Sequence, residues 1–545
     1  MAGLSDTKTS EEAETPGRGS FWLWVLPNFT VFVSSGCIMV VELVAGRLIA
    51  RYVGSSLYTW TSVIGIVLAG IAAGNYAGGR LADRYRPSDA LASLFLVASA
   101  TCLLIPMLNV RAGNWMMLRD QEWVLRIFGH VFLVFFLPST LLGTIGPVAA
   151  KMALDLGRET GRTVGSVYSW GALGSIVGTF LTGYYLIARM GTVAVLLSVA
   201  AILLAMALLF GSRSVLPFLW AGVIGASFLA MAGPFEQARV AGERLGLRPS
   251  HGNWVHFHKE TQYSTISVED EDDMPGVRSM TLDFLIHAYV NMNDPEELVY
   301  EYEQIYAAVT RAAAQGRPAG RRLRALSLGG GGFVFPRWLL RQWPDSYLEV
   351  AEIDPEVTRA AHESFGLSIE TPIRVFNLDA RNHVEDVLRQ VEGGAPGREF
   401  DFVYADAFNH YSPPFHLTTR EFNDKLRRLM APDGVLLANV IDIYRSGRFI
   451  GAMINTLEAS FPHVYAISSS PAGPSDDDGR DTFIIVASGR PLDLGDLVTG
   501  IGAGMALDPE QLATLRRRSE GFVLTDDFAP VDNMLAPVIR MADKQ

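Results

Sequence analysis

Long apolar segments in the first 235 residues constrain the fold of this chain more than any other feature. A bilayer crossing takes about 20 predominantly apolar residues, and backbone polar groups inside lipid can be satisfied only in helices or closed barrels. Segments of sufficient length lie at residues 21–46, 57–79, 90–110, 127–154, 164–188, 191–211 and 215–235. The sequence therefore predicts a membrane domain of about seven helices.

Glycines recur at three- or four-residue spacing in the second and fifth of these segments. This spacing puts small residues on one helix face, where it permits two backbones to approach closely. We therefore expect close helix packing at these positions. The glycines concerned are Gly70, Gly74, Gly78, Gly79, Gly171, Gly174 and Gly178.

Two further features of the apolar region favour transport or sensing. Glu42 lies inside the first segment, where an ionisable side chain is costly unless it is paired or functional. An ion pair with Arg47 and a role in ligand binding are equally compatible with its position. The second segment ends in the sequence from Gly79 to Arg84, which resembles the usually cytoplasmic loop motif of major-facilitator transporters.

The chain as a whole divides by composition. Its 545 residues are 49% hydrophobic, and the excess is confined to the apolar region. We expect a disordered tail at residues 1–20, a transmembrane domain at 21–236, a linker with a β-hairpin subdomain at 237–290, and a Rossmann-like domain at 291–545. The net charge of −12 argues against a nucleic-acid partner, whose binding surface would be basic.

A glycine-rich stretch organises the second half of the chain. An apolar run at residues 325–328 meets four consecutive glycines, and a helical pattern and a second apolar run ending at Asp354 follow. This order predicts strand, tight turn, helix and strand, with backbone close to a ligand at the glycines. Glu352 is placed to bind the two hydroxyls of a ribose, while Asp354 shapes the turn. The stretch therefore favours an adenosine-type ligand over a loop that merely connects elements.

Strands and helices alternate around this stretch. Runs between Trp254 and Ile286 predict β-hairpins, and Pro295 to Ala314 predicts a helix. Further strands are expected at residues 373–377, 402–405, 435–440, 464–468 and 482–487, and further helices at 355–364, 380–390, 418–430 and 448–460. The alternation predicts a parallel, doubly wound sheet with its ligand at the carboxyl ends of the strands. Four acids fall at such ends: Glu352, Asp354, Asp379 and Asp406.

Taken together, residues 250–540 resemble the spermidine synthase (polyamine aminopropyltransferase) family. With the apolar segments ahead of them, the chain resembles its membrane-fused branch. The order and spacing of several motifs carry this resemblance. Besides the glycine-rich turn, they are Glu260–Tyr263, Leu282–Asp283, Glu352–Pro355, Asp379–Arg381, Asp406–Phe408 and Leu524–Pro530.

The resemblance implies a donor, an acceptor and a role for each site residue. The donor would be decarboxylated S-adenosylmethionine or S-adenosylmethionine itself, used as a co-substrate without a metal. Asp406 matches the family's catalytic base, Glu352 its ribose ligand and Asp379 its ligand for the adenine amino group. The residues implied to bind the donor are Gln262, Gly329, Gly330, Gly331, Glu352, Ile353, Asp379 and Ala380. Those implied to bind the acceptor are Tyr263, Asp283, His287, Asn409, Tyr411, Asp526 and Asp527.

The chain departs from the family pattern at several positions. Gly332 stands where the family has an aspartate that binds the donor's aminopropyl nitrogen, and Asn409 stands where it has a second acid. His287 aligns with a glutamine, and the triplet around residues 301–303 is altered. With glycine at position 332, the chain also lacks the negative charge of an aspartate that would repel the carboxylate of intact S-adenosylmethionine. The identity of the donor is therefore left open.

Three functions follow from these features. The first is aminopropyl transfer from decarboxylated S-adenosylmethionine to an amine acceptor, favoured by Asp406. The second is methyl or aminocarboxypropyl transfer from S-adenosylmethionine, favoured by Gly332. The third is a non-catalytic transporter or sensor of polyamine or nucleoside, favoured by Glu42 and the loop ending at Arg84.

We expect an integral protein of a bacterial inner membrane, with its catalytic domain in the cytoplasm. Its partners would be a small amine or polyamine substrate and the lipid membrane, with no nucleic acid; a homodimer is left open. Arginines and lysines are divided almost evenly between the loops on the two sides of the predicted membrane domain, so the positive-inside rule does not set its orientation. An odd number of spans would put the N-terminus outside, which conflicts with a cytoplasmic loop at residues 79–84.

Overall fold

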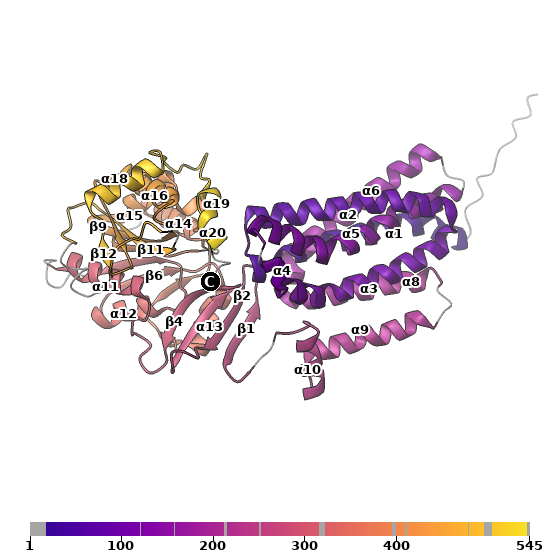
Figure 1. Cartoon of the computed structure of the whole chain (residues 1–545), viewed down its shortest axis with the longest axis horizontal. Helices are drawn as coiled ribbons and strands as arrows, with labels where there is room; N and C mark the ends of the chain where they lie inside the picture. The colour runs from indigo at the N-terminus through magenta and orange to yellow at the C-terminus, as the bar shows by residue number, and fades with distance from the viewer. Residues whose placement is uncertain are drawn as a thin grey trace, which may run out of the picture. The chain divides into compact units, whose positions relative to one another are not determined.

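The structure, a computed structural model, describes most of the chain. The described residues are 18–119, 121–156, 159–211, 215–249, 252–315, 322–394, 399–408, 411–477, 479–494 and 504–541. They form two compact units (Figure 1). One comprises Met1–Ala45, Ser62–Ala112 and Val131–Arg248, and the other comprises Gly46–Thr61, Gly113–His130 and Pro249–Gln545.

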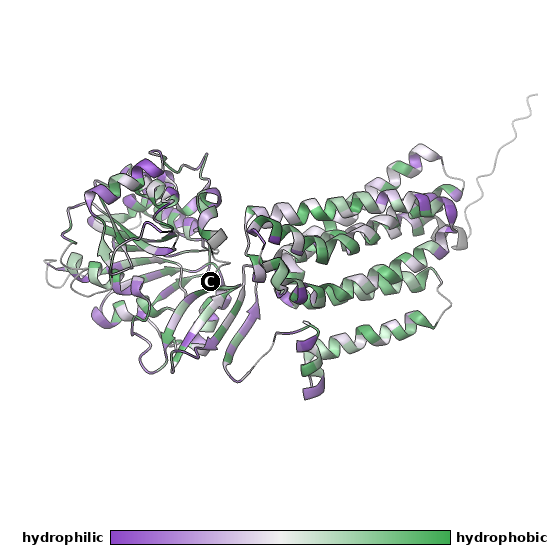
Figure 2. Cartoon of the chain, in the orientation of Figure 1, coloured by the Kyte–Doolittle hydropathy of each residue, from purple (hydrophilic) through white to green (hydrophobic). Residues whose placement is uncertain are grey.

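The first unit is built from long apolar helices. In the described part of the chain, six helices are long and apolar enough to cross a membrane. They are Val25–Val53 of α1 (Arg18–Val53), α2 (Leu57–Arg84), α3 (Pro87–Gly113), α5 (Trp123–Asp155), the segment Thr160–Met190 and α8 (Thr192–Leu209). Figure 2 shows hydrophobic residues along most of the length of these helices. The predicted number of seven is reached only if the pair described next counts as one span.

That pair consists of α9 (Leu216–Ala232) and α10 (Glu236–Arg244), which meet at an angle of 101°. Gly233 ends α9 with a left-handed backbone (φ 60°), as expected of a glycine after a helix C-terminus. The expected linker before the β-hairpin subdomain begins with α10, in which Ala238 and Gly242 are buried.

The glycine repeats do bring helices into close contact, as predicted. A Cβ added at Gly74 would lie 2.1 Å from the carbonyl oxygen of Thr140 on α5. One added at Gly174, on α6 (Thr160–Leu181), would lie 2.1 Å from the carbonyl oxygen of Phe32 on α1. Glycine is therefore required for α2 to pack on α5 and for α6 to pack on α1 at these distances. Gly79 is an exception, because nothing described lies within 4 Å of such a Cβ.

The second unit contains a small antiparallel sheet. Its strands are β1 (Val255–Glu260), β2 (Thr265–Asp270), β3 (Val277–Leu282) and β4 (Leu285–Asn291), paired in that order. The sequence predicted the first three as hairpins but not β4 as a separate strand. A two-residue turn at Asp283 and Phe284 joins β3 to β4, and Asp283 takes a positive φ of 57°. Asp tolerates this conformation better than most residues, and the turn aims the chain back along the sheet.

The larger sheet has eight strands in the order β12-β10-β11-β9-β8-β5-β6-β7. These are β5 (Arg324–Leu328), β6 (Tyr347–Ala351), β7 (Arg374–Phe376), β8 (Phe400–Ala405), β9 (Met430–Asp442), β10 (His463–Ser468), β11 (Asp481–Ser488) and β12 (Met505–Ala506). The intervening helices are α11 (Glu301–Ala314), α12 (Val334–Gln342), α13 (Pro355–Ser364), α14 (Ala380–Glu392), α15 (Arg420–Leu429) and α16 (Arg448–Glu458). The helices α18 (Pro509–Arg518), α19 (Val531–Met534) and α20 (Ala536–Met541) follow.

The prediction of an entirely parallel sheet is wrong at one end. Strands β5 to β9 are parallel to one another, but β11 is antiparallel to both β9 and β10, and β12 is antiparallel to β10. The chain passes from β10 to its neighbour β11 through residues 469–480, without a helix. Adjacent strands joined directly run in opposite directions, because a parallel pair needs a crossover connection.

The register of the parallel strands aligns their carboxyl ends. Leu328, the last residue of β5, pairs with Ala351 of β6 and with Ala405 of β8. The next residue of each strand, Gly329, Glu352 or Asp406, therefore leaves the sheet at the same edge. Burial of β5 and β8 on both faces explains their nearly continuous apolar sequences. This edge is where the functional residues gather.

Candidate active site

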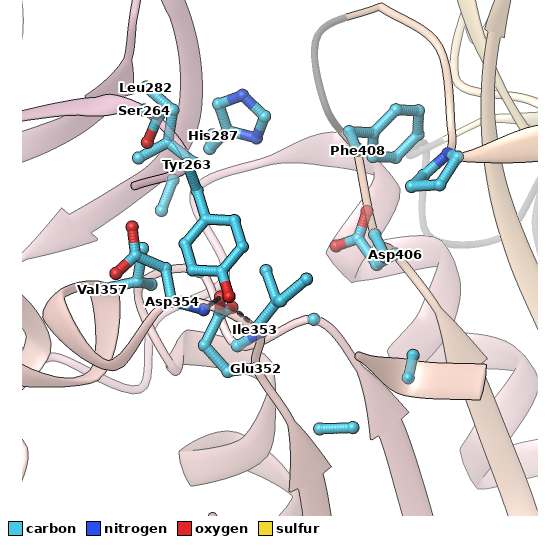
Figure 3. Close-up of a pocket in the computed structure, with 18 of the residues that line it drawn as sticks. Tyr263, Ser264, Leu282, His287, Glu352, Ile353, Asp354, Val357, Asp406 and Phe408 are labelled. Atoms are coloured by element: carbon cyan, nitrogen blue, oxygen red, sulfur yellow. Dashed lines mark hydrogen bonds between the residues drawn. The ribbon is translucent and has the colours of Figure 1, made fainter. Parts of the chain in front are cut away.

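A cavity lies at the carboxyl ends of β5, β6 and β8 and extends to the turn between β3 and β4. Figure 3 shows Tyr263, Glu352 and Asp354 on one side of it, with Asp406 and Phe408 opposite. Most of the residues implied to bind the donor or the acceptor line this cavity. They are Gln262, Tyr263, Asp283, His287, Gly329, Gly330, Gly331, Glu352, Ile353, Asp379, Ala380 and Asp406.

Glu352 is held by the backbone of the glycine-rich turn. Its Oε2 accepts a hydrogen bond from the Gly330 N–H (2.8 Å) and its Oε1 accepts one from the Asp354 N–H (2.9 Å). Each carboxylate oxygen retains a further lone pair for a ligand donor. Burial raises the pKa of Glu352 to about 7, although these N–H groups favour the charged form. The carboxylate is thus oriented before any ligand binds.

The turn itself requires glycine. Gly329 has a φ of 103°, and a Cβ there would lie 2.3 Å from the carbonyl oxygen of Asp406. The backbones that follow β5 and β8 are therefore in direct contact. Phe333 begins α12 with a left-handed φ of 56°, which is unusual for a bulky residue, and its side chain is fully buried. Burial of the aromatic ring offsets the strain of that conformation.

Gly332 does not leave room for a side chain. A Cβ at this position would lie 2.9 Å from the Cβ of Ala288 and 3.0 Å from Cγ2 of Val290, both on β4. The turn is therefore packed against the small sheet at Gly332, and a side chain there would require a shift of β4 or of the turn.

Asp406 is positioned by two side-chain donors. The Tyr302 hydroxyl donates to its Oδ2 (2.8 Å) and the Asn439 Nδ2 donates to its Oδ1 (2.8 Å). Burial raises the pKa of Asp406, and these two hydrogen bonds oppose that rise. Both donors come from elements distant in sequence, α11 and β9, so the carboxylate is oriented without a cation. A raised pKa suits a carboxylate that must accept a proton near neutral pH.

Asp354 and Asp379 both cap helices. Asp354 accepts from the Glu356 N–H (3.0 Å) at the start of α13 and from the Thr261 hydroxyl (2.5 Å). This confirms its predicted role in the turn. Asp379 accepts from the Arg381 N–H (2.9 Å) at the start of α14, and its Oδ2 faces His416 Nε2 at 2.9 Å. The hydrogen bond with His416 lowers the pKa of Asp379.

The other side of the cavity comes from the small sheet. Asp283 accepts the Thr265 N–H (2.9 Å), and burial raises the pKa of its carboxyl group. His287 lies on β4, and burial lowers its pKa to about 4. Its imidazole is therefore neutral at pH 7, and Nε2 has no hydrogen-bond partner among the described residues. Tyr263 is 45% exposed, and burial together with the negative charges of Asp354, Asp379 and Glu352 raises the pKa of its hydroxyl.

The remaining implied acceptor residues are placed elsewhere or are not described. Within the described part of the chain, Tyr411, Asp526 and Asp527 do not line the cavity. Tyr411 packs its ring against Phe284, with centroids 6.0 Å apart. Asp526 forms an ion pair with Arg381 and accepts from Thr419, and the hydrogen bond from Arg381 lowers its pKa to about 2. Asn409 lies outside the described residues.

Several cavity or supporting residues were not assigned from the sequence. They are Tyr302, Glu303, Tyr306, His416 and Asn439. Asn439 could have been identified from the sequence as the lone amide in the apolar run of β9, because a polar side chain in a buried strand needs a partner. Tyr302 and Glu303 lie in the first turn of α11, which begins six residues after the predicted helix start at Pro295. In the described part of the chain, no cluster of His, Cys, Asp and Glu side chains could hold a metal ion.

Several known proteins are similar to this chain in sequence or in fold. No family model matches the chain. Over 468 residues it is 24% identical to polyamine aminopropyltransferase 2 of Streptomyces coelicolor, which covers 82% of this chain and 79% of that protein. Over 134 residues it is 34% identical to the polyamine aminopropyltransferase of Vibrio vulnificus, covering 25% of this chain and 42% of that protein. The crystal structure of a probable spermidine synthase from Corynebacterium glutamicum aligns with a TM-score of 0.43 and 20% identity, over 52% of this chain and 98% of that chain.

Proposed function

We propose that this chain, a relative of the polyamine aminopropyltransferases along most of its length, is a membrane-bound enzyme of the same kind. It would transfer an aminopropyl group from decarboxylated S-adenosylmethionine to a small amine or polyamine. The observation that carries the proposal is the oriented carboxylate of Asp406, held by Tyr302 and Asn439 in the cavity that also contains Glu352. The proposal includes the division into a transmembrane domain up to residue 236 and a transferase domain from residue 291.

The proposed reaction needs little from the protein beyond positioning and one base. A neutral amine nitrogen attacks the aminopropyl carbon next to the sulfonium. The new carbon–nitrogen bond forms as the carbon–sulfur bond breaks, and the sulfur leaves as a neutral thioether. The attacking nitrogen becomes positively charged and gives a proton to the Asp406 carboxylate. The raised pKa of Asp406 supports this role.

The donor would occupy the glycine-rich side of the cavity. Glu352 would accept hydrogen bonds from the ribose hydroxyls, and the backbone of Gly329 to Gly331 would allow the ligand to approach closely. Asp379 would accept from the adenine amino group through the lone pair of Oδ2 that the hydrogen bond with His416 leaves free. Gln262, Ile353 and Ala380, which also line the cavity, would complete the nucleoside site.

The acceptor would enter beside the small sheet. Tyr263, Asp283 and His287 line that side of the cavity. Aromatic and carboxylate groups both favour a cationic ligand. The negative net charge of the chain is compatible with a cationic substrate.

The decisive variant is Asp406→Asn, assayed with decarboxylated S-adenosylmethionine and a diamine. Turnover should fall by about 10²- to 10⁴-fold because the base is lost. Calorimetric affinity for 5′-methylthioadenosine should change by less than about threefold, since Asp406 is not assigned to the nucleoside site. As a matched control, Asp345→Asn removes an exposed carboxylate that does not line the cavity and should leave turnover unchanged. Unchanged turnover in Asp406→Asn would exclude this residue as the base.

Gly332 favours a second candidate, a methyl- or aminocarboxypropyl-transferase that uses intact S-adenosylmethionine. No carboxylate stands in the turn to repel that of the intact donor. Calorimetry of the purified protein with both donors separates the two functions. A preference for the decarboxylated donor supports aminopropyl transfer, and a preference for the intact donor supports the second candidate. Binding of neither would contradict both, and binding without any turnover would indicate a sensor or transporter.

The proposed location is a bacterial inner membrane, with the transferase domain in the cytoplasm. Six helices of sufficient length and apolarity support insertion into a membrane. A cytoplasmic location of residues 291–545 follows from the substrates, because S-adenosylmethionine derivatives are cytoplasmic metabolites.

A further inference from the structure

A buried carboxylate close to Asp406 has no assigned role. Glu303 lies in the first turn of α11, is 7% exposed and lines the cavity. The backbone N–H groups of Phe335 and Tyr300 favour its charged form and so lower its pKa. Its Oε2 has no hydrogen-bond partner among the described residues. A buried carboxylate oxygen left without a donor is unfavourable, so a ligand donor is expected there.

The charges around Glu303 leave it without a cation. The nearest basic group that influences it is Arg337, whose guanidinium donates instead to the carbonyl oxygens of Phe333 (3.1 Å), Phe365 (2.8 Å) and Gly332 (3.2 Å). No ion pair joins Glu303 to a basic side chain in the described part of the chain. Burial and the negative charge of Asp406 raise its pKa well above the usual value. A bound cation would relieve both effects.

The surroundings of Glu303 suit an alkylammonium group. Aromatic rings form one wall: the centroids of Tyr302 and Tyr306 are 5.5 Å apart, and those of Tyr306 and Phe335 are 5.4 Å apart. Such rings attract a cation through their faces and contact its methylene groups. The Tyr306 hydroxyl and His287 Nε2, on two further cavity residues, also lack partners in the described residues. A primary ammonium group has three donors and no acceptor, so it matches a set of unpaired acceptors.

We propose that Glu303 is a specificity-determining residue of this cavity, whose carboxylate binds a primary alkylammonium group of a substrate and repels a carboxylate group. The inference rests on the proposed function, because it takes the ligand to be an amine. The ammonium group has two possible sources, the aminopropyl group of the donor and the distal amine of a diamine acceptor. If the ammonium group belongs to the donor, Glu303 supplies the negative charge that Gly332 leaves out of the turn, and this charge favours the decarboxylated donor over the intact one.

The test compares ligands that differ only in the relevant charge. Calorimetry would measure the affinity of the full-length protein and of Glu303→Gln for 5′-methylthioadenosine, decarboxylated S-adenosylmethionine and S-adenosylmethionine. A second series would compare 1,4-diaminobutane with butylamine in the presence of 5′-methylthioadenosine. Glutamine keeps one acceptor oxygen, removes the charge and replaces the second oxygen with an NH₂ donor. Glu301→Gln is the matched control, because Glu301 lies in the same helical turn but is exposed and does not line the cavity.

Glu303→Gln should reduce one of two preferences by about 10- to 100-fold. Loss of the preference for the decarboxylated donor assigns the ammonium to the donor, and loss of the preference for the diamine assigns it to the acceptor. Affinity for 5′-methylthioadenosine should stay within about twofold, which also shows that the variant is folded. Glu303→Asp keeps the charge and should retain part of the preference.

Three results would overturn the inference. They are unchanged preferences in Glu303→Gln, an equal loss of affinity for every ligand, and a loss in Glu303→Asp as complete as in Glu303→Gln. Failure of the proposed function is a separate result, because it would appear as absent turnover in the unmodified protein. The binding preferences can still be measured in that case.

Discussion

Glu352 has a carboxyl group whose ionisation should control nucleoside binding. Its two oxygens already accept backbone N–H groups, yet burial raises its pKa to about 7. Asp379, at the end of the next strand, has a lowered pKa because His416 and the start of α14 favour its charged form. Two acids at corresponding places in the fold therefore differ in protonation because of their local partners. Either acid could be placed from the sequence, but its pKa could not.

A pH dependence of nucleoside affinity follows. The ribose hydroxyls donate hydrogen bonds, so they bind better to the ionised form of Glu352. Because this pKa is raised to about 7, affinity for 5′-methylthioadenosine should increase as pH rises from 5.5 and level off above pH 7. The increase should approach about tenfold per pH unit below pH 6. Calorimetry between pH 5.5 and 8.5 measures it.

Glu352→Gln is the comparison for this experiment. It should bind 5′-methylthioadenosine more weakly and with a flat pH profile, since an amide does not titrate. An unmodified protein with a flat profile would contradict the predicted protonation of Glu352. A sloping profile in the Gln variant would assign the titration to another group.

At the scale of elements, the turn from β5 to α12 connects the nucleoside side of the cavity to Asp406. Gly329 brings the backbone of this turn against the Asp406 carbonyl, and Gly330 donates to Glu352. The strand register then aligns Glu352 and Asp406 at one edge. A change in the turn should therefore affect both sides of the cavity together.

Gly329→Ala tests that connection. The left-handed backbone alone should destabilise the fold by about 1–3 kcal/mol, and the contact of 2.3 Å with the Asp406 carbonyl adds to it. We expect a lower thermal midpoint and a loss of turnover as Asp406 is displaced. Gly366→Ala is the matched control: its φ is 67°, but nothing described lies within 4 Å of its Cβ. That control should lose stability only, and equal loss of turnover in both variants would contradict the role of the turn.

The elements themselves were largely predictable, and their arrangement was less so. Apolar runs next to glycine or acid residues predicted β5, β6 and β8 to within about two residues. The direction of β10, β11 and β12 was not predictable, because hydrophobic alternation is the same in parallel and antiparallel strands. The strand β4 was missed because it follows β3 after only two residues, and His287 interrupts its apolar pattern.

At the scale of the whole molecule, the apolar helices should make the chain an integral membrane protein. Six helices meet the length and composition of a bilayer crossing. In a bacterial host, the full-length protein should stay with the membranes after washing at high pH and should be released by detergent. A peripheral protein would be released by the wash alone.

Orientation can be measured in the same membranes. A tag after residue 545 should be digested by protease in inside-out vesicles and protected in right-side-out vesicles, if the transferase domain is cytoplasmic. The reverse pattern would contradict the proposed cytoplasmic location of the transferase domain. It would also contradict the proposal that this domain takes its donor from the cytoplasm. A second tag before residue 1 shows whether the two ends of the chain lie on the same side of the membrane. The same side indicates six crossings, and opposite sides indicate seven.

The sequence by itself determined the features that depend on local patterns. Segment length and apolarity identified the helices that could cross a membrane, and the glycine turn followed by an acid identified Glu352 and the strand edge. Asp406 was found in the same way, as an acid at a strand end. Each of these signals lies within about 30 residues of chain, where spacing alone limits the geometry.

Only the tertiary structure decided which distant residues complete the cavity. Tyr302 and Asn439 reach Asp406 across separations of 104 and 33 residues. It also decided that Asp526 pairs with Arg381 outside the cavity and that the buried Glu303 Oε2 has no hydrogen-bond partner among the described residues. The physical reason is that hydrogen bonding and burial depend on which surfaces meet when elements pack. Neither property is encoded in the spacing of residues along one element.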